Sequence, residues 1–247
     1  MNNLALRRNS IGLLMRKLSS VPVETDKYKF EVINSTHRND VYSFLCDNFR
    51  VDEPLSRAAN MGVTDIQKCF DGVLDRILKN NVSIMARSKA NNEIVGCMLN
   101  SVWSRKDFEN SKIENEQDFE FNGNQQGVEV IGEILNELHG SFWTLRPDQN
   151  VVLHFEISSV NKNHQRQGLA SKFMNWTENQ ALLRSVDATG IVAEASSLAN
   201  QILLGKRGYK TVSQILLESR KDGKTGEPVL KCDDGTDRVN LVFKEFS

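Results

Sequence analysis

A strand that leads through a short loop into a helix constrains the fold of this 247-residue chain more than any other feature. From Val151 to Ser158, strongly apolar side chains alternate with a second set that includes a histidine and a glutamate, which is the pattern of a central strand with one face buried. From Gly168 onward the apolar residues recur at helical spacing instead. Such a strand–helix unit indicates a mixed α/β architecture.

The loop between these two elements reads Gln165-Arg166-Gln167-Gly168-Leu169-Ala170. Backbone N–H groups at the start of a helix, together with the positive end of the helix dipole, can converge there on an anion. Gly168 and Ala170 let a ligand approach the backbone closely, and Gln165 and Arg166 can add polar contacts. The pattern Q-x-x-G-x-A also occurs by chance as a glycine in an ordinary turn, but its place between a strand and a helix favours a diphosphate site.

The rest of the chain predicts one domain over residues 26–247, a mixed β-sheet flanked by helices in the order β-α-α-β-β-α-β-α-β-α-β-β. Strands are expected at 28–33, 82–88, 93–103, 151–160, 191–193, 211–217 and 239–243. Helices are expected at 36–49 with Thr36 as the cap, at 64–79, at 128–146, from 168 to about 183, and at 197–207. Ser104 to Gly127 is rich in polar residues, and we interpret it as an exposed insertion.

Composition excludes several classes of protein. Hydrophobic residues make up 39% and charged residues 26% of the chain, as in ordinary globular proteins, and the apolar runs are too short to span a bilayer. Thirty-one basic and 32 acidic residues leave a net charge of -1, so we expect no nucleic-acid partner. The four cysteines are far apart and near no histidine pair, so we expect free thiols and no metal site. No feature defines an oligomeric state.

The first 25 residues differ from the rest. They carry Arg7, Arg8, Arg16 and Lys17 with no acidic residue before Glu24, and their apolar residues recur at helical spacing. This pattern is typical of a mitochondrial presequence, and it equally fits a basic tail without structure. We therefore expect the protein in the cytoplasm or the mitochondrial matrix.

The strand, the Q-x-x-G-x-A loop and the helix resemble the central signature of the GNAT superfamily of acetyltransferases, over roughly residues 28 to 245. The resemblance implies the GNAT fold, with acetyl-CoA as acyl donor and the loop Gln165 to Ala170 around its diphosphate. It also implies a bulge that separates the central strand from the next one, so that the backbone at Ile157 to Val160, including Ser159 and Val160, holds the pantetheine arm and the acetyl carbonyl. Transfer would be direct, without a covalent acyl-enzyme.

A second segment, Val51-Asp52-Glu53-Pro54-Leu55, resembles the D-E-P-L motif of invertebrate arylalkylamine N-acetyltransferases, in which the glutamate is the general base. The resemblance implies Glu53 as the base; alone, the segment also fits an ordinary loop between helices. An alkylamine with a pKa of about 10 is protonated at neutral pH and cannot attack a thioester until it loses that proton. A glutamate would need burial or a water relay to raise its pKa from about 4.3 toward the working pH.

A third match lies at the start of the last helix, where serines of the same family take part in proton transfer. The resemblance implies that role for Ser196, whose alternative role is to cap the helix. Two departures count against full agreement. The second family serine falls on Asn200, and Leu204 occupies the spacing at which many members carry the tyrosine that protonates the thiolate.

Alternatives remain open for the base and for the reaction. Glu156 and His154 share one face of the central strand, where other GNAT branches place their base, whereas His139 and His164 have no assigned role. Aromatic residues could line an amine pocket or form core, namely Phe49, Trp103, Phe142 and Trp143. The favoured acceptor is an arylalkylamine; a polyamine, a protein lysine, or a non-catalytic acyl-CoA-binding module are the alternatives.

Overall fold

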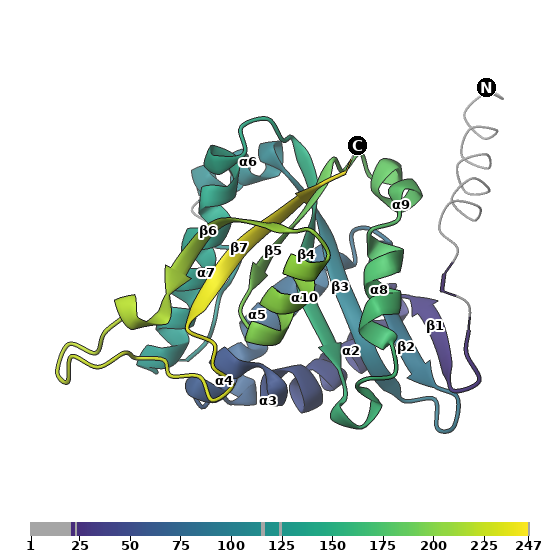
Figure 1. The fold of residues 1–247 in the computed structure, drawn as a ribbon, viewed down its shortest axis with the longest axis horizontal. Coiled ribbons are helices and arrows are strands. Elements are labelled where there is room, and N and C mark those ends of the chain that lie inside the picture. Colours follow the sequence, from purple (N-terminus) through teal and green to yellow (C-terminus); the bar gives the residue numbers. More distant parts are fainter. Residues whose placement is uncertain (1–20, 23, 115–116, 124, 247) are drawn as a thin grey trace.

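The computed structural model describes residues 21–22, 24–114, 117–123 and 125–246. Its centre is a seven-stranded sheet in the order β1-β2-β3-β4-β5-β7-β6. The strands are β1 (Tyr28–Val32), β2 (Ile84–Ser88), β3 (Ile94–Ser104), β4 (Val151–Val160), β5 (Gly190–Ala195), β6 (Lys210–Leu216) and β7 (Arg238–Glu245). Only β4 and β5 pair in parallel among these strands; the other neighbours are antiparallel. The predicted mixed sheet is confirmed (Figure 1).

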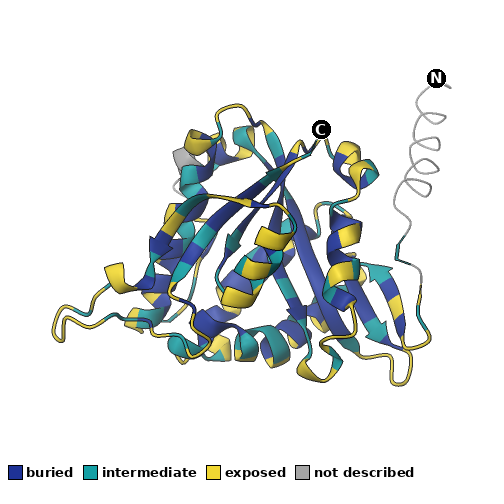
Figure 2. Cartoon of the chain, viewed as in Figure 1, coloured by how far each residue is buried: buried dark blue, intermediate teal, exposed yellow. Residues whose placement is uncertain are grey.

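Helices cover both faces of the sheet (Figure 1). They are α2 (Arg38–Phe44), α3 (Arg50–Asp52), α4 (Pro54–Ala58), α5 (Val63–Ile77), α6 (Arg105–Glu114), α7 (Gln126–Leu145), α8 (Leu169–Thr177), α9 (Gln180–Ser185) and α10 (Leu198–Lys206). Side chains of α2, α5 and α7 form one hydrophobic cluster with the sheet, and those of α8, α9 and α10 form a second on the opposite face. Figure 2 shows the buried strands between helices whose outer faces are exposed.

The first predicted helix has a different start and end. Thr36 is not its cap: the side chain of Asn34 accepts a hydrogen bond from the Thr36 backbone N–H at 2.9 Å instead. The chain continues from α2 through a π-helical turn into α3, which ends at Glu53 in extended conformation. Pro54 explains the break, because a residue before proline avoids the helical region while proline itself suits the first helical position.

The segment Ser104 to Gly127 is largely exposed, as its polar composition predicts, but it contains a helix and two buried aromatic residues. Residues 105–114 form α6, and the side chains of Phe108 and Phe119 are buried. Phe108 packs edge-to-face on Trp103 with ring centroids 5.9 Å apart. Two buried aromatic residues that do not recur at helical or strand spacing cannot be recognised in the sequence. Their burial therefore follows from tertiary packing.

The predicted helix after Gly168 is two helices. The side chain of Asn179 accepts a hydrogen bond from the Ala181 backbone N–H at 2.8 Å and so starts α9 after α8 has ended. The predicted apolar residues are nevertheless buried, among them Trp176 in α8 and Leu183 in α9. The break therefore changes the direction of the chain and keeps the hydrophobic face on the sheet.

The proposed presequence, residues 1–25, lies almost wholly outside the described residues. Among the helices that the structure describes, none is long and apolar enough to cross a membrane.

Candidate active site

Strands β4 and β5 separate part-way along the sheet. On one side of β4, Leu99 faces Ile157 and Asn100 faces Phe155, so Glu156 has no partner on β3 and forms a bulge. On the other side, the pairing with β5 ends at Phe155 and Ala193, although β5 continues to pair with β7 as far as Ala195. The bulge that the GNAT resemblance implies is present, and a gap opens beyond it.

Three hollows meet at this gap. We call the space between the separated strands the strand gap; it is lined by Phe155 to Ser158 of β4 and by Ala193 to Ser196. An outer cleft of about 270 Å³ extends from it along Ser159, Val160 and Gln165. An inner cavity of about 70 Å³ lies between α4, α5 and α7. Phe49 and Ser196 line all three hollows, so the hollows are contiguous.

The loop Gln165 to Ala170 adjoins the outer cleft, which its first residue, Gln165, lines. Gly168 precedes α8 with a φ of +79°, and a Cβ built on it would meet nothing within 4 Å. The positive φ, rather than lack of space, therefore requires glycine here. Because the first N–H groups of a helix have no partner within it, the N–H groups from Leu169 onward are free to bind an anion.

The side chains of this loop divide between solvent and protein. Arg166 is exposed, with a φ of +59°, whereas Leu169, the first residue of α8, is buried. Gln165 donates to the carbonyl of Val160 at 3.1 Å, and Gln167 accepts from the Tyr28 hydroxyl at 2.8 Å. These contacts fix the loop and leave its backbone open.

Glu53 lies where the inner cavity meets the outer cleft. Its side chain caps α4, because Oε2 accepts from the Ser56 backbone N–H at 2.6 Å. Its other oxygen, Oε1, accepts from the Ser196 hydroxyl at 2.9 Å. Burial raises the pKa of Glu53 above its ordinary value, although both hydrogen bonds oppose the rise. Among the residues that the structure describes, no cationic side chain forms an ion pair with Glu53.

Ser196 does not cap the last helix, contrary to the alternative role that we considered for it. The cap of α10 is Ser197, whose hydroxyl accepts from the Asn200 backbone N–H at 3.3 Å. The Ser196 hydroxyl is thereby left to donate to Glu53 across 143 residues of sequence. Asn200 and Leu204 line the strand gap beside it, so no tyrosine hydroxyl stands at either position.

Glu156, the rival base, is locked in its charged form. Its side chain is fully buried, and Arg76 binds it with two nitrogens at 2.7 and 2.8 Å while the Ser101 hydroxyl donates at 2.7 Å. Burial alone would raise the pKa of Glu156, but Arg76 and His154 hold it well below its ordinary value. A carboxylate so stabilised has little affinity for a substrate proton.

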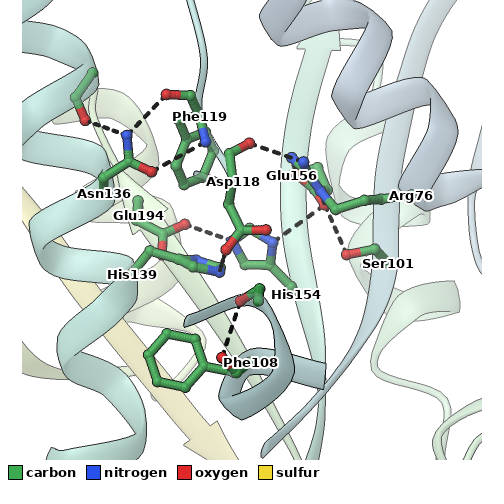
Figure 3. A network of polar contacts seen from close by, with 12 residues as sticks. Arg76, Ser101, Phe108, Asp118, Phe119, Asn136, His139, His154, Glu156 and Glu194 are labelled. Atoms are coloured by element: carbon green, nitrogen blue, oxygen red, sulfur yellow. Dashed lines mark hydrogen bonds and ion pairs between the residues drawn. The ribbon is translucent and has the colours of Figure 1, made fainter. Parts of the chain in front are cut away.

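His154, the other rival, belongs to a buried chain of charges that also includes His139 (Figure 3). His154 lies 2.5 Å from one oxygen of Glu194, and His139 lies 2.9 Å from the other. The second ring nitrogen of His139 is 3.2 Å from Asp118, and that of His154 is 3.4 Å from Glu156. We call these five residues with Arg76 the charge network.

The charge network is balanced by protonated histidines. Burial lowers the pKa of His154, but Glu194 and Glu156 outweigh burial and raise it to about 10. The same ion pairs lower the pKa of Glu194 to about 2 against the effect of burial. Two imidazolium ions and Arg76 thus face three carboxylates. His139, His154 and Glu194 could hold a metal by donor type, but each ring nitrogen already faces a carboxylate oxygen.

Sequence reasoning missed Arg76, Asp118 and Glu194. They come from α5, the segment before α7, and β5. The only usable signal was the alternation that puts His154 and Glu156 on one face of β4, since it shows where a counter-charge is needed but not which residue supplies it.

The four aromatic residues divide between the two roles that the sequence left open, pocket lining and core. Phe49 lines the inner cavity, whereas Trp103, Phe142 and Trp143 belong to the hydrophobic core. Trp103 stacks on His139 with ring centroids 3.7 Å apart. The remaining aromatic lining of the inner cavity comes from three other residues, Phe70, Phe119 and Phe121.

No known family model matches this sequence, and no curated protein matches it. Solved structures do. The fold resembles arylalkylamine N-acetyltransferase 2 from Aedes aegypti with 26% identity and a TM-score of 0.73, over 89% of this chain and 99% of that one. It also resembles mosquito arylalkylamine N-acetyltransferase like 5b (15%, TM-score 0.70, 89% and 100%) and the Drosophila melanogaster polyamine N-acetyltransferase (13%, TM-score 0.69, 89% and 100%).

The bulged β4, the strand gap and the loop before α8, in a fold shared with these enzymes, define a GNAT-fold protein. By its likeness to the Aedes aegypti enzyme, the chain is an N-acetyltransferase of the GNAT superfamily.

Proposed function

We propose that this protein transfers the acetyl group of acetyl-CoA to a primary arylalkylamine, with Glu53 as the general base. One observation carries the proposal. Glu53 is a buried carboxylate without an ion-pair partner among the described residues, hydrogen-bonded to Ser196, at the point where a cleft suited to CoA meets an aromatic cavity.

The outer cleft fits acetyl-CoA. The exposed backbone of the loop Gln165 to Ala170, with the positive φ of Gly168 and open space above it, suits a diphosphate. The strand gap suits the pantetheine arm, because strand β4 has no strand partner beyond Phe155 on that side. We assign Ser159 and Val160 to the pantetheine, and the N–H groups of β4 in the gap to the acetyl oxygen as it gains negative charge.

The reaction then needs no covalent intermediate. Glu53 takes a proton from the ammonium group, and the neutral amine attacks the thioester carbonyl. A C–N bond forms while the C–S bond breaks, the CoA thiolate leaves with the electron pair of that bond, and the acetylated nitrogen releases its second proton to solvent. The raised pKa of Glu53 suits proton removal near neutral pH, and Ser196, which lines all three hollows, can pass a proton from Glu53 to the thiolate.

The lining of the inner cavity favours an arylalkylamine over a polyamine. Four phenylalanines line the cavity, and of its three carboxylates Glu156 is paired with Arg76 and Glu194 with two histidines. Only Glu53 among them forms no ion pair with a described residue, although the charge of Arg57 acts on it from a greater distance. A second ammonium group would therefore be buried without a partner, whereas an aromatic ring finds an apolar surface. The likeness to the Aedes aegypti enzyme supports the same acceptor class.

The acceptor class is tested by turnover. The full chain is incubated with acetyl-CoA and tyramine, dopamine, serotonin, spermidine, agmatine or a lysine peptide, and thiol release is followed. We expect kcat/KM for the aromatic amines to exceed that for spermidine and agmatine by about 100-fold or more, the cost of one buried unpaired ammonium group. Faster turnover of spermidine would reject the arylalkylamine assignment, and CoA binding without turnover of any amine would identify a non-catalytic module.

The acetyl-CoA site is tested separately with Gly168→Val. The change should weaken acetyl-CoA binding at least about tenfold in calorimetry, because a branched side chain strains the positive φ and stands over the anion site. Gly226→Val is the matched control: Gly226 has a φ of +73° and equal open space, but lies in the loop after β6. Equal losses of affinity in both variants would reject the loop as the diphosphate site.

A further inference from the structure

The inner cavity has one wall that no helix or strand provides. Residues 117–121 lie between α6 and α7, and the rings of Phe119 and Phe121 face the cavity. The same two residues also line a groove of about 450 Å³ on the other side of the segment, against α7. The segment therefore has a hollow on each of its two sides, and Phe119 is its buried member.

Polar contacts hold the wall in place (Figure 3). The side-chain amide of Asn136 on α7 bonds both backbone groups of Phe119, at 3.1 Å to its N–H and 2.8 Å to its carbonyl. Arg76 donates to the Asp118 carbonyl at 2.9 Å. The Asp118 carboxylate forms the 3.2 Å ion pair with His139. The wall is thus attached to the end of the charge network.

Phe121, in contrast, is held mainly by shape. A Cβ added to Gly132 of α7 would lie 3.3 Å from its ring, so the ring rests directly on the glycine. No side chain of the described residues forms a hydrogen bond with the Phe121 backbone, in contrast to Phe119. Phe121 is also only partly buried. Its position follows that of the Asp118–Phe119 anchor two residues before it.

We propose that residues 117–121 determine which amine this enzyme accepts. Phe119 and Phe121 set the size of the acceptor ring, and Asp118 is a positioning residue that acts through its ion pair with His139. The proposal rests on the inner cavity as the acceptor site. The wall differs in kind from the rest of the cavity, because helices and strands carry the other lining residues or directly adjoin them.

The first test enlarges the cavity. Phe121→Ala should raise KM for phenylethylamine about tenfold, as loss of apolar pocket contacts does, while kcat and KM for acetyl-CoA stay within about twofold. KM for tryptamine, which has a larger ring, should rise less. The ratio of kcat/KM for tryptamine to kcat/KM for phenylethylamine should therefore increase. Phe121→Leu, which keeps an apolar side chain, should show the same shift at smaller size and covers the case in which the alanine variant fails to fold.

The second test loosens the anchor. Asp118→Asn should raise KM for phenylethylamine about threefold, the net worth of one hydrogen bond, and shift the ring preference in the same direction as Phe121→Ala. Asp118→Glu should restore the preference because it restores the charge. Glu120→Gln is the matched control, since Glu120 lies in the same segment and pairs with Lys68 at the surface.

The outcomes separate this proposal from the acetyltransferase assignment. Active variants with an unchanged ring preference would reject the proposed role of residues 117–121 in acceptor choice. The acetyltransferase assignment would remain. A fall in kcat with unchanged KM would likewise reject that role, because that result indicates a general disturbance of the catalytic centre. Loss of amine turnover already in the unaltered chain would overturn both.

Discussion

Two carboxylates face the same cavity and differ in almost everything else. Glu53, between α3 and α4, has two neutral hydrogen-bond donors and a raised pKa. Glu156, at the bulge of β4, has Arg76 and His154 beside it and a lowered pKa. Both are buried, so burial does not separate them. The counter-charges decide that one carboxylate can take a proton and the other holds the structure together.

The comparison also supports the proposal that the base is Glu53 and not a residue of the central strand. A charge network of six residues occupies the position where His154 and Glu156 would otherwise meet the substrate. Its three positive and three negative charges balance, so removing the charge of one buried member leaves a net charge inside the network. This occupation of β4 is the reason that we propose Glu53, at the edge of the cavity, for the catalytic role.

Breaking the Glu53 side of the comparison should have the largest effect. Glu53→Gln should lower kcat about 10²- to 10⁴-fold while acetyl-CoA binding is kept. In the unaltered enzyme kcat should rise with pH through the folded pKa of Glu53, which lies above the ordinary 4.5, and the variant should lack that rise. Steady-state kinetics across pH measure both, with the exposed Asp47→Asn as control. Near-normal turnover, combined with its loss in Glu156→Gln, would place the base on β4.

Removing the charge of Glu156 should lower the stability of the protein instead. Glu156→Gln leaves Arg76 and His154 short of a counter-charge and should lower the free energy of unfolding by about 3–5 kcal/mol. Denaturant titration measures the loss. A double variant, Arg76→Met with Glu156→Leu, should lose less than the single change because no buried charge is left unpaired between the two positions. A single variant as stable as the parent would show that the network is not a structural support.

The charge network should also make stability depend on pH. The folded pKa of His154, about 10, lies above the ordinary 6.5, so its contribution is complete below pH 6.5 and is lost as pH rises toward 10. Thermodynamic stability should fall in that window with a slope of about 1 kcal/mol per pH unit. Glu194, with a pKa of about 2, should lose its contribution as pH falls from 4.5 toward 2. His154→Gln should flatten the alkaline slope and His37→Gln should not; equal slopes would contradict the assignment.

Substitutions of two adjacent serines, Ser196 and Ser197, should have the smallest effects and test the role of Glu53 further. Ser196→Ala should lower kcat about tenfold by removing one hydrogen bond to a charged group. It should also move the pH profile upward, because that hydrogen bond lowers the pKa of Glu53. Ser197→Ala should instead cost about 1 kcal/mol of stability through loss of the α10 cap and leave kcat near normal. Identical effects on kcat would remove Ser196 from the proposed proton transfer.

Local features were predictable from the sequence because neighbouring residues produce them. The alternation of β4, the glycine that must adopt a positive φ before α8, and the proline that ends α3 all depend on short-range sterics and periodicity. The D-E-P-L segment likewise pointed to Glu53 before any contact was visible. The order of elements along the chain predicted a mixed sheet, which the structure confirmed, whereas the order of the strands within the sheet came from the structure alone.

The pairing of charges was decided only by the tertiary structure. Arg76, Asp118 and Glu194 lie 80, 38 and 38 residues from Glu156, and nothing in their local sequence marks them as partners. The same is true of Phe119 and Phe121, whose polar surroundings suggested exposure. The sequence alone therefore determined the fold class and the candidate residues. Tertiary structure decided their chemistry, because a carboxylate's proton affinity depends on which charges lie within a few ångströms, and folding brings those from distant parts of the chain.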